Sequence, residues 1–200
     1  MEHTYRLKDG SQVIVRDLTV DDVEASYEFF KSFSEDRRRY FRSDVTVLDY
    51  IRKRILKTED GQIIRRVAIL DGEFVGDGSL EIATKSWKSG EAQLRLVILP
   101  EYEGKGIQFV FAKDMYDMAH ERHLNKIIVK FMRPQEDLMR IYSELGFHME
   151  GVLPDYLVDQ AGHEQDMVVM IATLEDMRKA YKFVGDWLDD EHGTIRAGEM

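Results

Sequence analysis

The stretch LRLVILPEYEGKGIQFVFAKDMYDMAHER, residues Leu94–Arg122, decides the fold. It begins within an apolar run, Ala92–Leu99, that is typical of a strand, and Pro100–Gly106 is typical of a loop. A helix is predicted to begin at Ile107, because apolar residues recur on one helical face at Val110, Phe111, Met115 and Met118. A strand, a loop and a helix therefore follow one another directly.

Two glycines, Gly104 and Gly106, stand where the loop enters the helix. Glycine tolerates left-handed backbone angles and lets a ligand approach the main chain closely. The N–H groups and the dipole at a helix N-terminus attract phosphate. The Walker motif would need a glycine at Leu99 and Ser or Thr at Gly106, and the Rossmann fingerprint would need a glycine at Phe109. The loop therefore predicts a phosphate or pyrophosphate site of another kind.

The segments before this stretch predict one strand, two helices and a hairpin. The strand is Gln12–Arg16, Thr19 is the expected N-cap of the first helix, and a second helix begins near Thr46. These helices are expected to cover part of a sheet.

The hairpin is predicted from Arg66–Leu70 and Glu73–Ile82, which flank Asp71-Gly72. This dipeptide supplies the positive φ angles that a tight turn needs. Within the second strand, Gly76-Asp77-Gly78 favours a bulge, because paired glycines weaken a regular strand.

The segments after the helix predict a strand, a helix, a hairpin and a last helix. They are Lys126–Phe131, Glu136–Leu145 with Gly146 as its C-cap, the strands His148–Leu153 and Met167–Ala172 joined by a turn near Gly162, and the amphipathic helix 174–188. The last helix is expected to dock on the domain or to pair two subunits into a homodimer, and residues 189–200 are expected to be disordered. The predicted order is β, α, α, β, β, β, α, β, α, β, β, α.

Composition excludes several classes of function. The chain of 200 residues contains no cysteine, so it has no disulfide, thiol nucleophile or Cys-based metal site. Its net charge of -10 argues against nucleic acid as a partner, and the short basic run Arg37–Arg42 is expected to be a solvated face. No apolar run approaches the 18 or so residues that span a bilayer, and no signal peptide is evident. No membrane partner and a cytoplasmic location are predicted.

Three segments carry a resemblance to a known family: Ala92-Gln93-Leu94, Gly104-Lys105-Gly106-Ile107 and Arg140–Phe147, which reads RIYSELGF. Together they resemble the GCN5-related N-acetyltransferase (GNAT) superfamily, and the similarity covers roughly Gln12 to Ala172. The region from Ser34 to Phe41 is similar to the acetyltransferase domain of bacterial protein lysine acetyltransferases. The resemblance implies an α/β (α+β) fold with a mixed central sheet flanked by helices. The domain is expected at 1–173, followed by the extra helix and the tail.

The same resemblance implies acetyl-CoA as co-substrate and a primary amine of a protein or small molecule as acceptor. It implies that the backbone of Val97 and Ile98 bonds acetyl-CoA, and that Gln135 contacts it as an amide. The pyrophosphate would lie on Glu103, Gly104, Lys105, Gly106, Ile107 and Gln108. The phenol of Tyr142 would protonate the departing thiolate, as a general acid.

Three residues depart from the family pattern. Glu103 replaces Gln or Arg and would repel a pyrophosphate, Gln108 replaces a small Gly or Ala, and Gln135 replaces a common Asn. These departures raise an alternative function, a degenerate GNAT-fold module that binds acyl-CoA weakly or not at all and acts in regulation or interaction.

The general base stays open, because Gln93 stands where the family often has a carboxylate. Glu81, Glu91 and His148 are candidates, and deprotonation of the amine before binding is another. The acidic residues of the last hairpin, which border the acceptor pocket in the family, are expected to be solvated loop charges: Asp155, Asp159, Glu164 and Asp166. His120 and His123 lie three residues apart on the predicted helix and are expected to be surface residues, so no metal site is predicted.

Overall fold

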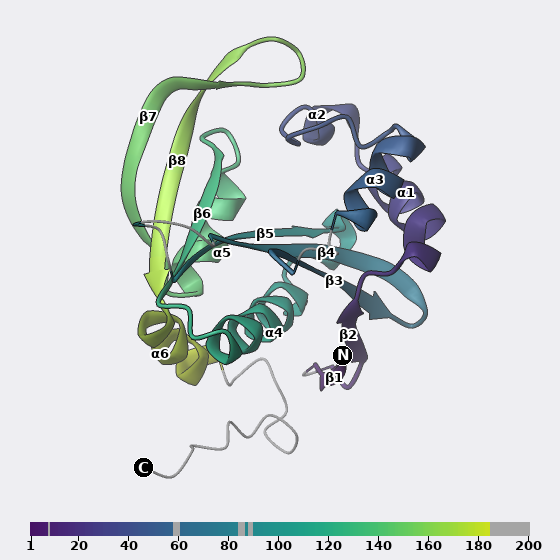
Figure 1. The fold of residues 1–200 in the computed structure, drawn as a ribbon, viewed down its shortest axis with the longest axis vertical. Coiled ribbons are helices and arrows are strands. Elements are labelled where there is room, and N and C mark those ends of the chain that lie inside the picture. Colours follow the sequence, from purple (N-terminus) through teal and green to yellow (C-terminus); the bar gives the residue numbers. More distant parts are fainter. Residues whose placement is uncertain (8, 58–60, 84–86, 88–89, 185–200) are drawn as a thin grey trace.

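A computed structural model describes residues 1–7, 9–57, 61–83, 87 and 90–184 (Figure 1). Its strands form one sheet in the order β1-β2-β3-β4-β5-β6-β8-β7. The strands are β1 Glu2–Arg6, β2 Gln12–Asp17, β3 Ile63–Leu70, β4 Glu73–Ile82, β5 Glu91–Ile98, β6 Lys126–Met132, β7 His148–Val158 and β8 Glu164–Thr173. Neighbours are antiparallel except β5 and β6, which are parallel.

Helices cover both faces of the sheet (Figure 1). They are α1 Val23–Lys31, α2 Glu35–Arg38, α3 Leu48–Leu56, α4 Ile107–Glu121, α5 Glu136–Glu144 and α6 Leu174–Val184, with the short 3-10 helices η1 Val20–Asp22 and η3 Pro100–Tyr102. The predicted fold class, a mixed sheet flanked by helices with an additional C-terminal helix, is confirmed.

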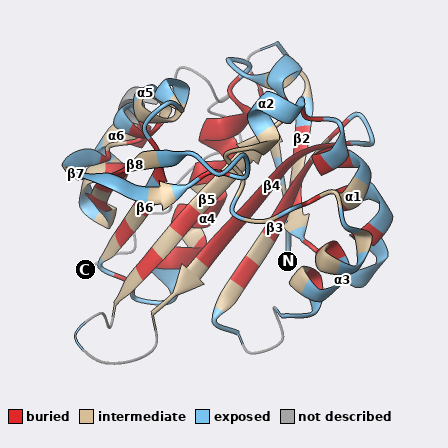
Figure 2. Ribbon diagram, turned by 90° about the horizontal axis from the view of Figure 1, so that it is seen from above, coloured by how far each residue is buried: buried red, intermediate tan, exposed pale blue. Residues whose placement is uncertain are grey.

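Two apolar cores result from the period of two along the central strands. On one face, α4 buries Phe111 and Met115 among residues of β3 to β6. On the other face, α1 and α3 bury a smaller cluster that includes Phe29, Phe30 and Ile51. Figure 2 shows that buried residues concentrate in the central strands and α4, whereas β7 is largely exposed.

The glycines of β4 allow α4 to lie close to the sheet. A Cβ atom on Gly78 would stand 2.8 Å from side-chain atoms of both Phe111 and Met115, so only glycine fits there. The bulge predicted at Gly76–Gly78 is displaced. Both glycines pair in regular register with β3, and the irregularity falls where the pairing steps from Gly76 to Phe74. The glycines therefore serve helix packing.

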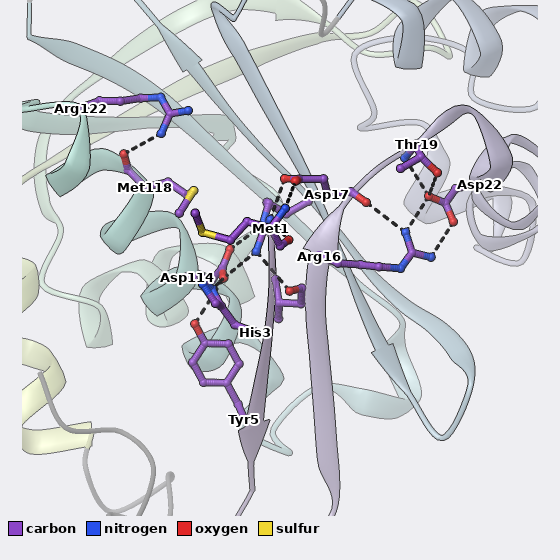
Figure 3. A network of polar contacts seen from close by, with 12 residues as sticks. Met1, His3, Tyr5, Arg16, Asp17, Thr19, Asp22, Asp114, Met118 and Arg122 are labelled. Atoms are coloured by element: carbon purple, nitrogen blue, oxygen red, sulfur yellow. Dashed lines mark hydrogen bonds and ion pairs between the residues drawn. The ribbon is translucent and has the colours of Figure 1, made fainter.

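A buried ion-pair network ties the N-terminal strands to α4 (Figure 3). The fully buried guanidinium of Arg66 donates to both carboxylate oxygens of Asp114, at 2.8 and 3.0 Å, and also to Asp17 at 2.7 Å. The ring Nδ1 of His3 lies 2.7 Å from Asp114. A buried charge pair is tolerated when its remaining hydrogen-bonding groups are also satisfied. This network satisfies those of Arg66.

The structure differs from the sequence prediction in several elements. Strand β1 and the single-turn helix α2 were not predicted, and His123 lies beyond the end of α4 with a φ of 54°. Strands β7 and β8 extend further toward their turn than the predicted 148–153 and 167–172. The C-terminal helix is present to Val184, while 185–188 and the tail 189–200 lie outside the described residues.

Candidate active site

Strands β5 and β6 separate part-way along their length. They pair only from Glu91 to Gln93 of β5, so from Leu94 onward this edge of β5 has no strand beside it. The opening lies at the N-terminus of α4, which carries the predicted cofactor residue Gln108, and beside α5, which carries Tyr142.

Tyr142 lies at this opening. The residue is 3% exposed, and its ring packs on Phe131 and Phe147 at centroid distances of 5.9 and 5.4 Å. Burial raises the pKa of the Tyr142 hydroxyl to about 12, while the backbone N–H of Leu96 and the charge of Arg95 act in the opposite direction. The hydroxyl therefore meets the free edge of β5 and stays protonated at neutral pH.

Backbone alternation indicates which groups of β5 face the opening. The N–H of Leu99 donates to Val75 of β4 at 3.0 Å. Because neighbouring residues of a strand turn their polar groups to opposite sides, Val97 faces β4 as Leu99 does, whereas Leu96 and Ile98 face the opening. Their N–H and C=O groups stand at the edge that β6 leaves uncovered.

The glycine loop has the geometry expected of an anion cradle. Gly104 and Gly106 adopt φ angles of 76° and 88°, and a Cβ on Gly104 would meet no atom within 4 Å, so its surface is open. Gly106 is the N-cap of α4, and no side chain caps the helix there. The first N–H groups of α4 are therefore available to a ligand.

Glu103 precedes these glycines and is held by Arg37 from α2. The two side chains form a bidentate ion pair with N–O distances of 2.5 and 3.4 Å. Hydrogen bonding to Glu103 raises the pKa of the Arg37 guanidinium. The sequence predicts that Glu103 repels a pyrophosphate and that Arg37 belongs to a solvated basic face. The ion pair opposes this repulsion, because Arg37 partly neutralises the carboxylate.

Gln108 lies in the first turn of α4 and faces the opening. It lines a small cavity of about 50 Å³ together with Leu96, Ile98, Glu103, Leu138, Ile141 and Tyr142. The residue is 7% exposed, and its Oε1 atom has no hydrogen-bond partner within the described part of the chain. An unsatisfied buried acceptor beside Tyr142 is a position that a ligand N–H would fill.

Gln135 is engaged elsewhere. Its Oε1 accepts a hydrogen bond of 3.1 Å from the N–H of Met132 at the end of β6. This contact shapes the connection from β6 into α5, which carries Tyr142.

The candidate bases are held by other charges. Glu81 accepts two hydrogen bonds from Arg95, at 2.7 and 2.8 Å; burial alone would raise the pKa of Glu81, but these bonds hold it below its usual value. Glu91 forms an ion pair with Lys126 at 2.9 Å. His148 is exposed at the start of β7. None of these arrangements places a free carboxylate or imidazole beside Tyr142.

The last hairpin reaches across to α2, as the bend of its tip in Figure 1 shows. The side chain of Asp159 is fully buried and accepts from Arg39 at 2.6 Å. The side-chain amide of Gln160 donates to the carbonyls of Phe41 and Ser43. The expectation of a solvated charge is therefore wrong for Asp159, which fastens the hairpin to Arg39 at the end of α2.

Neither a second hollow nor a metal site offers an alternative place for catalysis in the described part of the chain. A larger hollow of about 250 Å³ lies beside β1 and β2, where Arg16 and Asp22 satisfy each other at 2.7 Å, and it contains none of the predicted site residues. Across the described residues, no cluster of three or more His, Asp or Glu side chains is arranged to hold a metal ion.

Within the described part of the chain, no helix combines the length and apolar character needed to cross a bilayer.

The sequence matches no protein-family model and none of the curated proteins. Solved structures do match the fold. RimJ of Mycobacterium smegmatis in complex with CoA-disulfide has a TM-score of 0.77 at 18% identity, over 92% of this chain and 93% of that one. The ribosomal-protein-S5-alanine acetyltransferase of Vibrio fischeri has a TM-score of 0.72 at 17% identity, over 88% and 98% of the two chains.

A third structure is the spermidine N-acetyltransferase of Vibrio cholerae in complex with CoA and spermine, with a TM-score of 0.70 at 20% identity over 83% of this chain and 98% of that one. An acetyltransferase of the GNAT family from Streptococcus pneumoniae shares the fold as well. The chain therefore has the fold of the GNAT N-acetyltransferases.

Proposed function

We propose that this protein is an N-acetyltransferase that moves an acetyl group from acetyl-CoA to a primary amine by direct attack. The observation that carries the proposal is the position of the buried Tyr142 hydroxyl at the free edge of β5, next to the glycine loop. Three features there match three parts of acetyl-CoA. The proton donor serves the departing thiolate, the open strand edge serves the pantetheine arm, and the anion cradle serves the pyrophosphate.

The residues at the opening fit acetyl-CoA, which would supply the acetyl group as a thioester. The uncapped N–H groups of Gly106, Ile107 and Gln108, next to the open surface of Gly104, would bind the pyrophosphate, whereas the N–H of Lys105 donates to Tyr102. The carbonyl of Leu96 and the N–H and C=O groups of Ile98 would bond the pantetheine arm. The backbone groups of Val97 face β4 instead. The unsatisfied Oε1 of Gln108 would accept a hydrogen bond from an amide of that arm.

Tyr142 acts as the general acid. The raised pKa of its hydroxyl keeps the proton in place until the thiolate leaves, and the neighbouring Leu96 N–H stabilises the oxygen when the proton has gone. The amine loses its proton before it binds, because Glu81 and Glu91 are occupied by Arg95 and Lys126. Direct attack needs no nucleophile from the protein: the nitrogen bonds the acetyl carbon, the carbon–sulfur bond breaks, and the proton that the nitrogen then loses restores the Tyr142 hydroxyl.

The acceptor is a protein amine or a small-molecule amine. The proteins of the same fold include one named for an alanine of ribosomal protein S5 and one named for spermidine. We propose the cytoplasm as its location, where acetyl-CoA is available, and neither nucleic acid nor a membrane as its partner. Pairing of two subunits through α6 stays a prediction.

A second function, a degenerate module with weak or absent acyl-CoA binding, is favoured by Glu103 and Gln108. The ion pair of Glu103 with Arg37 weakens that argument, because the carboxylate is partly neutralised. Release of CoA from acetyl-CoA, measured over a panel of amines and peptides, separates the two. Release that depends on the amine supports the enzyme, and its absence across the panel supports the module.

A further inference from the structure

Charged side chains gather on the face of the sheet opposite α4. Register pairing places Arg65 of β3, Ser79 of β4 and Arg95 of β5 on one rung, with their side chains on the same face. Glu81 lies on the next rung of that face, and Arg42 approaches it from the segment between α2 and α3. Asp77 and Arg54 complete the cluster.

The cluster has more cations than anions. Four guanidinium groups, those of Arg42, Arg54, Arg65 and Arg95, face the two carboxylates of Asp77 and Glu81. Arg54 pairs with Asp77, and Arg95 pairs with Glu81 through two hydrogen bonds. Arg42 reaches Glu81 only at 3.9 Å. Among the described residues, two positive charges are therefore left without a matched carboxylate.

Arg65 is the most poorly compensated member. It forms no ion pair with a described carboxylate, and its Nε atom is buried without a hydrogen-bond partner. Burial, followed by the charge of Arg54, lowers the pKa of Arg65 to about 10. Leaving a guanidinium partly buried and unpaired costs stability, and such a cost is expected where a ligand supplies the missing charge.

The cluster lies beside the candidate active site, on the face of the sheet opposite α4 and the glycine loop. Arg95 directly precedes Leu96, whose N–H meets the Tyr142 hydroxyl, and its charge acts on that hydroxyl. The side chains of Arg95 and Leu96 point to opposite faces. A molecule that contacts the arginine face can therefore reach the opening between β5 and β6 from the side opposite α4 and its glycine loop.

We propose that Arg42, Arg65 and Arg95 form a subsite for an oxyanion, a carboxylate or a phosphate, carried by the amine acceptor. This inference rests on the proposed function and names its substrate class, anionic amines. Guanidinium groups match both oxyanions in geometry and charge. The subsite disfavours polyamines, although the acidic net charge of the whole chain would attract them.

Matched acceptors test the subsite. β-Alanine is compared with β-alaninamide, and phosphoethanolamine with ethanolamine, so that each pair differs only in the anion. The parent protein is expected to favour at least one anionic member by about tenfold in kcat/KM. Arg65→Gln should lower that ratio toward one, whereas Arg52→Gln, which removes an exposed arginine of α3, should leave the ratio unchanged.

A binding measurement keeps the test independent of turnover. Glutarate and inorganic phosphate, at about 10 mM, are expected to raise the unfolding midpoint of the parent, and Arg65→Gln should lose this rise. The unliganded Arg65→Gln variant should itself unfold at a higher temperature than the parent, because the unpaired charge is gone.

The results separate the two proposals. Equal rates on the charged and neutral members, or a preference for spermidine, would overturn the subsite while leaving the acetyltransferase in place. Equal protection of parent and Arg65→Gln by both glutarate and phosphate would also overturn it. Absence of acetyl transfer to every amine, with protection by an oxyanion intact and lost in Arg65→Gln, would overturn the proposed function alone.

Discussion

The hydroxyl of Tyr142 lies against the backbone N–H of Leu96, at a point where β5 has already separated from β6. In a continuous sheet that N–H would face a neighbouring strand. Here it faces a buried phenol and a small cavity instead. The separation of two parallel strands thus provides both the space for a ligand and the polar groups that hold it.

Tyr142→Phe is expected to lower turnover by about 100-fold or more, because it removes the proton donor for the thiolate. Affinity for acetyl-CoA should change little, since the phosphate and backbone contacts remain. Steady-state kinetics and calorimetric titration measure the two quantities. Tyr181→Phe is the matched control, because it removes a buried hydroxyl of α6 that has no partner among the described residues. Turnover of Tyr142→Phe equal to that of the control would exclude the acid role.

Gln108→Leu is expected to weaken acetyl-CoA binding and to stabilise the free protein. Leucine has a similar size but lacks the unsatisfied Oε1, whose burial costs about 1–3 kcal/mol. Chemical unfolding and calorimetric titration follow the two effects. Unchanged or tighter binding would show that Gln108 obstructs the cofactor, as its size suggests, and does not bond it.

Glu103→Gln is expected to tighten acetyl-CoA binding up to about tenfold at low salt, because Arg37 is released to pair with a phosphate. The gain should shrink as salt screens the charges. Glu101→Gln removes an exposed carboxylate of the same loop without releasing Arg37, so it separates local charge from the ion pair. An equal gain from both variants would rule out a role for the pair.

The hydrogen-bonded carboxylate of Asp159 leads us to predict that the free energy of unfolding falls in acid. Burial would raise the pKa of Asp159, but hydrogen bonds from Arg39, His163, Gln165 and Ala161 hold it well below its ordinary value of 3.8. The carboxylate therefore contributes stability above pH 3.8 that is lost as the pH falls through the lowered pKa. Asp159→Asn should lower the unfolding free energy at pH 7 and flatten this acid limb, measured by urea unfolding across pH. The exposed Asp155→Asn is the control on the same hairpin, and an unaltered limb in Asp159→Asn would contradict the assignment.

The sequence predicts the parts of the fold that local patterns encode. The turn at Asp71-Gly72, the start of α4 at Ile107 and the end of α5 before Gly146 each depend on neighbouring residues, and all three are confirmed. Strand β1 has no clear pattern of alternating apolar residues, because it lies at the sheet edge, where no residue of the strand is fully buried, and its residues are largely polar. Strand β7 is exposed along most of its length, and the outer residues of β8, Glu164 to Asp166, are exposed or half-buried.

Ion pairs between residues far apart in the chain could not be predicted from the sequence. Glu103 and Arg37 are 66 positions apart, and Asp159 and Arg39 are 120 apart, so no local pattern joins them. The dense basic run Arg37–Arg42 indicates many positive charges in one segment, and such a run usually forms a solvated face, so it does not identify the partners of Arg37 and Arg39. The charge surplus around Arg65 likewise emerges only when three strands align.

Isothermal titration of the full chain with acetyl-CoA tests the central claim most directly. Binding through the glycine loop and the free edge of β5 predicts measurable heat with a dissociation constant between about 1 µM and about 1 mM, the usual range of substrate affinities. A matching rise in the unfolding midpoint should accompany it. Neither heat nor a thermal shift at millimolar acetyl-CoA would contradict the acetyltransferase.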